Sequence, residues 1–408
     1  ATEIESRYII PDEALFNRLR KMERWGELAS ERRRTVCTVD HYLDTPGRAI
    51  LRQECALRLR SQEGVWLLTL KGPRLAPGPV AERSEFEIEL PDRLEDPTQW
   101  PPGTIRSRVM ELTGGMPLQT LITISQRRHR QVLYCQERAV GELSLDMVRT
   151  MSGAMRQQSY LLECELGESG CHADLLQLDA VLQGDFGLVP EVRSKLRRAL
   201  DWVERGILPD EDVLQGRQPI AARTLAWRYG IDLTHAGWVA ALSQRLCAGL
   251  AAYHTLPPER WPLVETAALL HDVGSAAKRE RQHLVSRDIL LRQPIEGLLP
   301  NEELALAAAA YLVRAPDGPE HLDEVLPADL DPLMRHQCLT VAALVRLADA
   351  LDEPNTQSVD LRTIDAQQPV RITLDGQGAG SAARRAERAG DLWCQVGGPP
   401  IIWQTPKV

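Results

Sequence analysis

The chain has 408 residues, too many for one compact core, which favours at least two domains. Its net charge of −9 at pH 7 argues against a protein that holds nucleic acid on a broad basic face. The longest apolar stretch, residues 304–313, is about half the length needed to cross a bilayer, so we expect no membrane association and a cytoplasmic location.

Strands are predicted over most of the first 205 residues, because polar and apolar side chains alternate there between Gly, Pro and Asp turns. Helical spacing interrupts this pattern at residues 12–25 and 172–198. About eight strands are enough to close a barrel. The candidate strands cover residues 3–9, 35–43, 56–61, 65–71, 83–90, 120–134, 139–148 and 159–166.

Residues 208–219 are acidic and rich in turn-forming residues, which predicts a linker. Residues 220–356 then have helical periodicity almost throughout and predict a second, all-α domain. Residues 357–408 predict a small α+β appendage. The predicted helices of the all-α domain cover residues 238–254, 262–270, 284–291, 302–313 and 335–351. In the appendage the alternating segments are residues 370–374 and 392–396, and the helix is residues 382–389.

Charged residues recur on alternate positions of the predicted strands. Glu3, Glu5 and Arg7 open the chain in this way, and alternate residues of a strand share one face. Such a face is ordinary for an antiparallel sheet with water on one side. Like charges grouped on single strands, however, would repel their neighbours unless a ligand lay between them. The later members of the set are Arg58, Arg60, Lys71, Arg83, Glu85, Glu87, Arg128, Arg130, Asp146, Glu163, Glu165 and the helical Lys195.

A barrel whose interior carries these charges accounts for both the alternation and the grouping. Because a charged interior is costly to desolvate, it should be hydrated and suited to a highly charged ligand. Carboxylates are the natural ligands of Mg²⁺ and Mn²⁺, and arginines fork onto phosphate oxygens. The pattern therefore predicts a metal-bound oligophosphate as the ligand and phosphoryl transfer as the chemistry.

The order of these motifs resembles that of the CYTH superfamily, the triphosphate tunnel metalloenzymes, from residue 1 to about residue 205. Residues 3–7 resemble the Glu-x-Glu-x-Lys signature of that superfamily, and residues 41–46 resemble its Tyr-Phe-Asp-Thr-Pro segment. The further matches are residues 57–60 to a Leu-Arg-Ile-Arg strand, 68–71 to a lysine strand, 83–87 to an Arg-x-Glu-x-Glu strand, Asp146 to a late aspartate, 163–165 to a second Glu-x-Glu, and 194–195 to a helical Ser-Lys.

The resemblance implies an antiparallel eight-stranded β-tunnel in an α+β domain spanning residues 1–207. It also implies that Glu3, Glu5, Lys71 and Glu165 are catalytic. A triphosphate would be bound by Arg7, Arg58, Arg60, Lys71, Arg83, Arg128, Arg130 and Lys195. Mg²⁺ or Mn²⁺ would be held by carboxylates drawn from Glu3, Glu5, Glu85, Glu87, Asp146, Glu163 and Glu165.

Arg7 departs from the family pattern, which usually has a lysine at this position. Arginine keeps the charge but cannot be deprotonated, so we assign Arg7 to phosphate binding and not to proton transfer. Arg128 and Arg130 are placed in the tunnel, with Arg127 as the alternative register. The superfamily includes inorganic triphosphatases, thiamine triphosphatases and adenylyl cyclases. No segment identifies a purine pocket, so inorganic triphosphate is the simplest predicted substrate.

A His-Asp pair, His271 and Asp272, closes an apolar helix of the all-α region. Together with His235 upstream and Asp349 downstream, it could supply mixed imidazole and carboxylate ligands to one metal ion. The alternative is that these are packing residues, which is the commoner role of a helical histidine. The region resembles the HD superfamily of metal-dependent phosphohydrolases and, most closely, the C-terminal HD-like region of exopolyphosphatases and guanosine pentaphosphatases. Of that family's histidine-rich stretch only His283 remains, so we expect reduced metal ligation.

Three functions remain as alternatives. The first is a metal-dependent triphosphatase acting on inorganic triphosphate or short polyphosphate, with an HD-like domain in an accessory or second phosphohydrolase role. The second is a sensor that binds polyphosphate or a nucleotide in the tunnel. In the third, the HD-like domain is the main enzyme and hydrolyses a guanosine polyphosphate. Expected partners are inorganic triphosphate, polyphosphate or a nucleoside triphosphate, without nucleic acid or membrane, and a homodimer is a candidate assembly.

Overall fold

The computed structural model describes residues 2–74, 80–152, 155–205, 218–314 and 325–405. The chain divides into two compact units, Ala1–Gln215 and Gly216–Val408. Residues 208–217 of the predicted linker lie outside the described residues, and the predicted domain boundaries remain predictions. Within the described ranges, no helix is both long and apolar enough to cross a bilayer.

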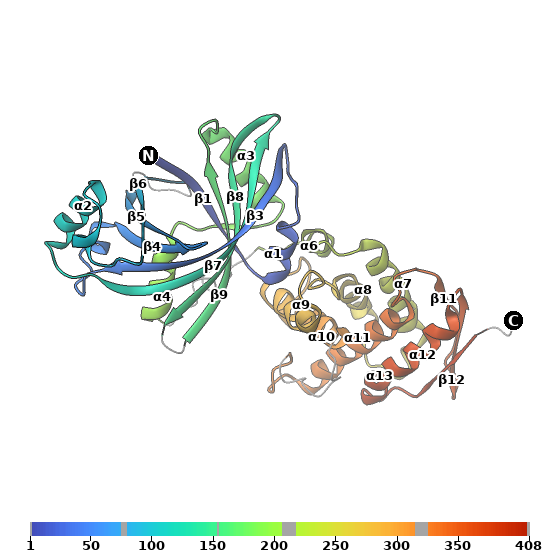
Figure 1. Ribbon diagram of the computed structural model, residues 1–408. Coiled ribbons are helices and arrows are strands. Elements are labelled where there is room, and N and C mark those ends of the chain that lie inside the picture. Colours follow the sequence, from blue (N-terminus) through green and yellow to red (C-terminus); the bar gives the residue numbers. More distant parts are fainter. Residues whose placement is uncertain (1, 75–79, 153–154, 206–217, 315–324, 406–408) are drawn as a thin grey trace. The chain divides into compact units, whose positions relative to one another are not determined.

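Antiparallel strands of the N-terminal unit close into a ring (Figure 1). Around the ring β1 pairs with β6, then β5, β4, β3, β7, β8 and β9 follow, and β9 pairs back with β1. β2 and β10 pair with β3 and β1 and make this a ten-stranded sheet. The strands are β1 Thr2–Ile10, β2 Arg24–Trp25, β3 Leu28–Asp44, β4 Ala56–Gln62, β5 Val65–Arg74, β6 Val80–Leu90, β7 Gln119–Cys135, β8 Arg138–Ser152, β9 Met155–Leu166 and β10 Val189–Pro190.

Two apolar clusters hold this ring. One lies on its outer face, where Leu57, Leu59 and Leu68 pack with Ile105 and Val109 of helix α2 (Thr104–Thr113). The other lies inside the ring, where helix α4 (Lys195–Arg205) inserts its apolar residues against inward-facing side chains of the strands. Its members are Ile9, Tyr42, Ile122, Ile124, Val148, Leu161, Leu196, Ala199 and Leu200. Helix α4 therefore fills part of the interior and brings its first residue, Lys195, toward the remaining space.

Two predicted helices of this unit are too long. Helix α1 (Glu13–Leu19) ends early, because Gly26 adopts a positive φ and lets Arg24–Trp25 fold back on β3 as β2. The predicted helix 172–198 is wrong as one element: helix α3 (His172–Gly184) ends, Gly187 adopts a positive φ, and Val189–Pro190 pairs with β1 before α4 begins.

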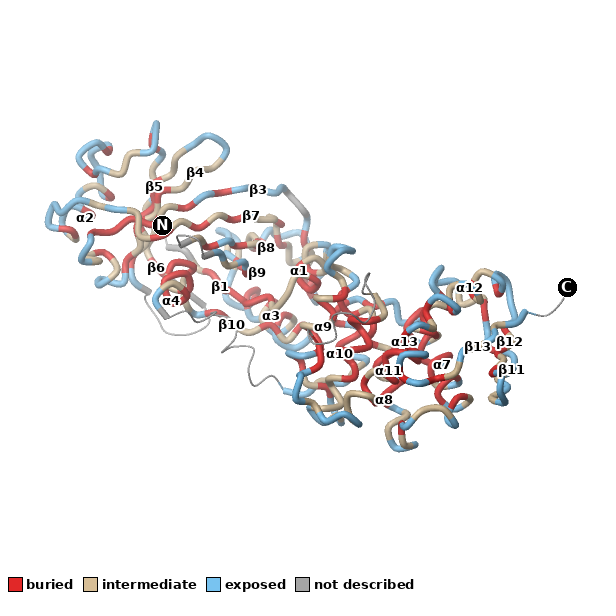
Figure 2. Tube along the Cα trace, turned by 90° about the horizontal axis from the view of Figure 1, so that it is seen from below, coloured by how far each residue is buried: buried red, intermediate tan, exposed pale blue. Residues whose placement is uncertain are grey.

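Helices with small apolar faces build the C-terminal unit. The alanine-rich helices α10 (Pro300–Arg314) and α11 (Pro332–Leu351) are largely buried and pack closely on each other (Figure 2). Asp232 caps α7 by accepting from the backbone N–H groups of Thr234 and His235, which fixes the start of that helix. The helices are α6 Ala222–Tyr229, α7 Leu233–Gly249, α8 Trp261–Leu270, α9 Gln282–Arg292, α10 Pro300–Arg314 and α11 Pro332–Leu351.

A small α+β segment follows α11. Strands β11 (Val359–Asp365), β12 (Val370–Gly376) and β13 (Ile401–Gln404) form a sheet in that order, accompanied by helices α12 (Ala379–Ala389) and α13 (Asp391–Gln395). The alternation at residues 392–396, which predicts a strand, is wrong. Leu392 and Trp393 are buried on a short helix that begins directly after Gly390, the C-cap of α12.

Candidate active site

Strand register places the predicted charges on the inner face of the ring. Arg58 lies opposite Tyr42, whose side chain is in the interior cluster, and Arg60 lies opposite Asp40. On the other side of the ring, Arg128 lies opposite Asp146. Arg127 is exposed, so the register with Arg128 and Arg130 facing inward is the one the structure has.

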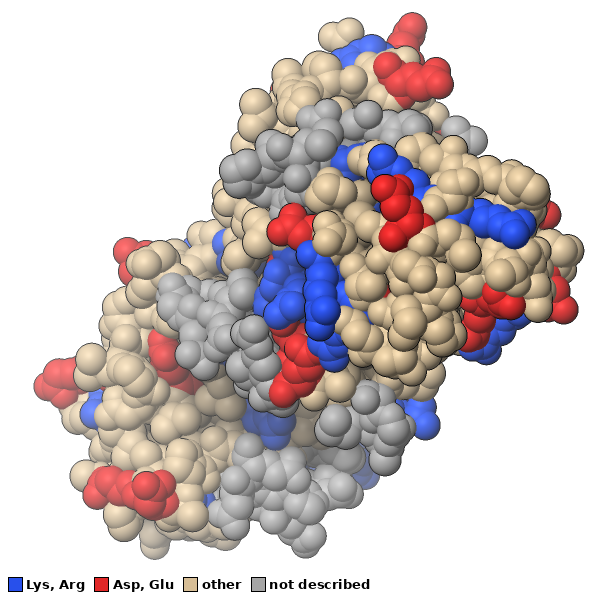
Figure 3. Space-filling model, turned by 90° about the vertical axis from the view of Figure 1, so that its left-hand side faces the viewer, with Lys and Arg blue, Asp and Glu red and all other residues tan. Residues whose placement is uncertain are grey.

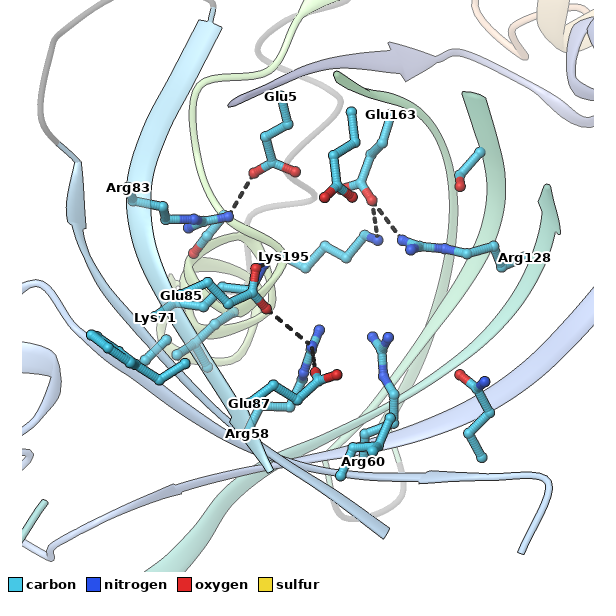
Figure 4. Close-up of a pocket in the computed structure, with 18 of the residues that line it drawn as sticks. Glu5, Arg58, Arg60, Lys71, Arg83, Glu85, Glu87, Arg128, Glu163 and Lys195 are labelled. Carbon is cyan, nitrogen blue, oxygen red and sulfur yellow. Dashed lines mark hydrogen bonds and ion pairs between the residues drawn. The ribbon is translucent and has the colours of Figure 1, made fainter. Parts of the chain in front are cut away.

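These side chains surround a cavity of about 840 Å³. Figure 4 shows Glu5, Arg58, Arg83, Arg128, Glu163 and Lys195 directed into it from different strands and from α4. On the face seen in Figure 3, acidic and basic side chains gather next to one another near the centre. The cavity, from here on the tunnel, is thus lined by both signs of charge.

Lys195 joins two buried carboxylates on one side of the tunnel. Its Nζ donates to Asp146 Oδ2 at 2.6 Å and to Glu163 Oε2 at 2.7 Å. Arg128 forks onto Asp146 at 2.9 and 2.7 Å and also reaches Glu163 Oε2 at 2.6 Å. Burial opposes the charge of Glu163, but Lys195, Arg7 and Arg128 outweigh it and hold its pKa well below the usual range. Burial and the neighbouring Arg128 lower the pKa of Lys195.

Arg7 bridges the first Glu-x-Glu segment to the second. Its Nη2 donates to Glu5 Oε1 at 2.9 Å, its Nε donates to Glu163 Oε1, and its Nη1 donates to the backbone carbonyl of Arg193 at 2.8 Å. Arg83 also donates to Glu5 Oε1, at 2.6 Å. In this geometry Arg7 orients two predicted metal ligands, and its predicted phosphate-binding role stays a prediction.

The basic wall opposite contains a buried carboxylate that the sequence analysis did not identify. Asp40 is fully buried and accepts from Arg60 Nε at 2.7 Å and Nη2 at 2.9 Å, and from Gln126 Nε2 at 2.6 Å. Arg58 Nη1 lies 4.0 Å from Asp40. These contacts fix the orientation of Arg60 and place the second arginine beside it.

The predicted carboxylates of β6 face the basic wall. Lys71 Nζ lies 3.1 Å from Glu85 Oε2, and Arg58 lies 3.9 Å from Glu85 and 3.8 Å from Glu87. Thr69 donates to Glu87 at 2.8 Å. Glu85 and Glu87 therefore neutralise part of this wall.

Two carboxylates meet across the strand pair that closes the ring. Glu5 on β1 lies directly opposite Glu165 on β9, and Glu165 lies directly opposite Glu142 on β8. Like charges in opposite cross-strand positions repel unless a cation lies between them. For Glu5 the guanidinium groups of Arg7 and Arg83 supply part of that positive charge, and the carboxylate oxygens of the row also suit Mg²⁺ and Mn²⁺. This row of residues therefore fits a divalent cation. Glu142, which also pairs with Arg130, was not among the predicted site residues.

Glu3 precedes this row on β1 and pairs through its backbone with Arg83 of β6. Its side chain is outside the described part of the structure, so its predicted catalytic and metal-binding roles stay predictions.

Comparison with known protein families identifies this part of the chain, since the model of the CYTH domain matches residues 1–169. Residues 1–169 form a CYTH domain. The matched region includes the ring from β1 to β9 and ends before Lys195 on α4. The match covers less than half of the chain and leaves the helical unit unassigned.

Solved structures similar to this chain also extend over about half of it. HpAC1 from Hippeastrum, for which a dominant triphosphatase activity is described, has 19% identity and a TM-score of 0.38, covering 49% of this chain and 95% of its own. The PH1819 protein from Pyrococcus horikoshii OT3 has 20% identity and a TM-score of 0.33, covering 49% and 98%. The Mimivirus capping enzyme triphosphatase has 11% identity and a TM-score of 0.26, covering 45% and 89%.

The segment that follows the CYTH match is bonded to strand β1 of the tunnel through Glu191. The buried carboxylate of Glu191 accepts from Arg193 Nε at 3.0 Å and Nη2 at 2.9 Å and also pairs with Arg198. The backbone N–H of Glu191 donates to the backbone carbonyl of Arg7 at 2.7 Å. Burial raises the pKa of Glu191, but the bonds from Arg193 and the charge of Arg198 outweigh it, so the pKa is lowered.

Glu191 is expected to contribute stability that disappears in acid. Because its pKa is lower in the folded protein than in the unfolded chain, where it is about 4.3, this contribution is present above that pH and is lost as the pH falls through the folded value. We expect Glu191→Gln to cost about 1–3 kcal/mol at pH 7 and to flatten the dependence of Tm on pH below about 4.5. Thermal unfolding between neutral and acid pH measures this. The surface variant Glu95→Gln should leave the wild-type pH dependence intact, and an identical slope for Glu191→Gln and wild type would contradict the expectation.

In the C-terminal unit, the predicted His-Asp set gathers around one carboxylate. His235 Nε2 lies 3.3 Å and His271 Nε2 lies 3.2 Å from Asp349 Oδ1, and all three side chains are buried. Asp272 instead forms a two-bond fork with Arg314 at 3.0 Å each. Burial lowers the pKa of His271, but the Asp272 and Asp349 carboxylates outweigh it and raise the pKa to about 9. Asp272 and Asp349 therefore favour a positive charge at the His271 imidazole, carried by a proton or by a metal ion.

Proposed function

We propose that the CYTH domain is a triphosphatase that hydrolyses inorganic triphosphate or short polyphosphate with Mg²⁺ or Mn²⁺. The observation that carries this proposal is the closed ring in which Glu5 and Glu165 lie opposite each other while several basic side chains line the same cavity. A highly charged anion with a divalent cation satisfies both sets of charges at once.

Within this proposal the carboxylates divide between two roles. Glu5 and Glu165 would hold the cation, with Glu3, Glu85, Glu87, Asp146 and Glu163 as the further predicted ligands and Glu142 as an addition from the register. When bound, such an ion stabilises charge on the leaving phosphate and lowers the pKa of a bound water. Asp146 and Glu163 also hold Lys195 in the tunnel.

The basic side chains would bind and orient the phosphate chain. Arg58, Arg60 and Lys71 form one wall, and Arg128 and Arg130 form the other. Arg83 is bonded to Glu5 and Lys195 is bonded to Glu163, and both of these carboxylates are proposed cation ligands. Since these charges are fixed by ion pairs before substrate arrives, they need little reorganisation when the terminal phosphoryl group develops charge in the transition state.

Phosphate release assays test this function. Wild type, Glu5→Gln and Asp272→Ala are each incubated with one substrate in the presence of Mg²⁺ or Mn²⁺. The substrates are tripolyphosphate, ATP, thiamine triphosphate and guanosine tetraphosphate. We expect wild type and Asp272→Ala to hydrolyse tripolyphosphate and Glu5→Gln to lose at least about 100-fold of kcat, since one donor or ligand at a charge-stabilising site is typically worth that much. No turnover of any triphosphate by wild type would overturn the proposal.

The same assay separates the alternatives. A sensor would bind tripolyphosphate in the tunnel, as measured by calorimetry, without releasing phosphate. If the HD-like domain is the main enzyme, Asp272→Ala removes activity and Glu5→Gln does not. Full activity of Asp272→Ala together with loss of activity in Glu5→Gln would leave the HD-like domain an accessory role.

Lys71→Ala is expected to raise KM for tripolyphosphate by about 10-fold to 100-fold with a smaller change in kcat. A hydrogen bond to a charged group contributes about 1.5–3 kcal/mol, and a wall residue binds ground state and transition state alike. Steady-state kinetics measure the change, and Lys21→Ala at an exposed lysine is the matched control. An unchanged KM would show that Lys71 does not contact substrate.

A further inference from the structure

One end of the tunnel is closed by the protein itself. Helix α4 lies inside the ring, where Leu196 and Leu200 pack against inward-facing apolar side chains of the strands such as Ile124. The members of this interior cluster are at most 7% exposed. Figure 4 shows Lys195, the first residue of α4, directed from this helix into the tunnel. In the part of the chain that the structure describes, α4 and the interior cluster thus form a floor, with Lys195 at its surface.

Exposure along β7 shows which end of the tunnel is open. On the inner face of this strand, Ile124 is fully buried and Gln126 is 4% exposed. The side chain of Arg128 is 20% exposed and that of Arg130 is 34% exposed. Lys195, at the floor, is only 9% exposed. Water therefore reaches the tunnel from the end at Arg130, which is called its mouth from here on.

Arg34 on β3 continues the basic row beyond the mouth. Its backbone lies directly opposite Arg130, and it is two residues from Val36, which lines the cavity together with Arg130. Residues opposite each other on antiparallel strands share a face, as do alternate residues of one strand, so Arg34 is on the face that leads into the tunnel. Its side chain is 52% exposed and lies 3.3 Å from Glu63, which directly follows β4. Such an exposed ion pair is weak, so a phosphate group can replace the carboxylate.

A closed floor decides which part of a long anion can reach the site. The basic side chains of the tunnel suit phosphate groups, and a linear polyphosphate is a chain of such groups. Because this chain cannot pass out through α4, only its end can enter, and the remainder must leave through the mouth past Arg130 and Arg34. An internal segment would have to enter as a loop, with two arms of like charge side by side in one cavity, and these arms repel each other.

We propose that the tunnel takes linear polyphosphate by its end and removes the terminal phosphate, and that Arg34 binds the part of the chain outside the mouth. This rests on the proposed triphosphatase function and extends it to chains longer than three phosphates. Asp146 and Glu163 accept from two of the three donors of Lys195, and the terminal phosphate can accept from the third. Water attacks the terminal phosphorus, and the bond from this phosphorus to the bridging oxygen breaks. Orthophosphate leaves, the bridging oxygen becomes the new end of the shortened chain, and a proton passes to the solvent.

End-blocked polyphosphate tests whether the substrate enters by its end. The full-length protein is incubated with Mg²⁺ and a long-chain linear polyphosphate, either free or with both terminal phosphates joined to a bulky amine through P–N bonds, and the chain lengths are followed on gels. We expect orthophosphate and gradual shortening from the free chain, and loss of hydrolysis with the blocked chain. Equal hydrolysis of both, with chains of intermediate length appearing early, would overturn the proposal. Hydrolysis of tripolyphosphate without hydrolysis of the free long chain would also overturn it, whereas inactivity on tripolyphosphate would instead refute the proposed function.

Arg34→Gln tests the binding residue outside the mouth. We expect it to raise KM for the long chain by about 3-fold to 5-fold, the range of an exposed ion pair, and to raise KM for tripolyphosphate by less. The ratio of the two KM values from steady-state phosphate release is the readout, because a general loss of activity leaves this ratio unchanged. Arg127→Gln is the matched control, since Arg127 is an exposed arginine on the outer face of β7. An equal ratio in wild type and Arg34→Gln would overturn the role of Arg34.

Discussion

Replacing Lys195 with methionine is expected to lower kcat/KM for tripolyphosphate by at least about 100-fold. Lys195 Nζ donates to both Asp146 Oδ2 and Glu163 Oε2, at 2.6 and 2.7 Å, and Arg128 Nη2 donates to the same two atoms. Removing one partner from a buried ionic group costs about 3–5 kcal/mol, because the remaining charges lose their compensation. With Arg128 still bonded to both but the Lys195 charge gone, the two carboxylates would repel each other more strongly and move, which disturbs the proposed cation and phosphate sites together. Steady-state phosphate release with Mg²⁺ measures the loss.

Two control variants make the Lys195 result interpretable. Lys21→Met makes the same substitution at an exposed lysine and should change neither kinetics nor Tm. Lys195→Arg keeps the charge but brings a planar fork into a site that holds a single ammonium nitrogen, so we expect only partial activity. Thermal unfolding shows how much of the effect is loss of fold. A folded Lys195→Met variant with more than half of the wild-type kcat/KM would show that this lysine is not part of the active site.

The inward-facing side chains of each strand could be predicted because a strand has a period of two residues. Arg58 and Arg60, for example, are two positions apart and both line the tunnel, whereas Leu57 and Leu59, which alternate with them, pack in the outer cluster. The pairing of Glu5 with Glu165 could not be predicted in the same way. It depends on ring closure between β1 and β9, strands separated by most of the domain.

Two site residues that were not predicted, Asp40 and Glu142, lie on strands whose alternating charges are visible in the sequence. Asp40 alternates with Tyr42 on β3, and Glu142 alternates with Asp146 across Ser144 on β8, so the same period of two would have found both. Arg314 gave no such signal, because it is one of many arginines and its partner Asp272 is distant in sequence. The break between α3 and α4 was missed although Gly184, Gly187 and Pro190 mark it, and such residues commonly end a helix.

Asp40→Asn is expected to raise KM for tripolyphosphate by about 10-fold or more with a smaller effect on kcat. Asp40 is fully buried and holds Arg60 by a two-bond fork while also accepting from Gln126. An asparagine amide would turn donors toward those donors and release Arg60 from its fixed position. Because Asp40 carries the same sign as the substrate, we expect it to act through the arginine and not through direct contact. Glu95→Gln, which removes a carboxylate paired with Arg93 at the surface, is the matched control.

A double-mutant cycle with Arg60→Gln decides whether Asp40 acts by positioning. If its only role is to orient Arg60, Asp40→Asn should have little further effect on KM once Arg60 is already replaced, which gives a coupling energy close to the full effect of the single change. Independent effects that add would contradict positioning of Arg60 and would leave the contact of Asp40 with Arg58, at 4.0 Å, as the cause of the raised KM. Loss of the negative charge of Asp40 should by itself strengthen the long-range attraction of the substrate and lower KM at low ionic strength. Misplacement of an arginine should instead weaken binding at every ionic strength, so the salt dependence of KM distinguishes the two effects.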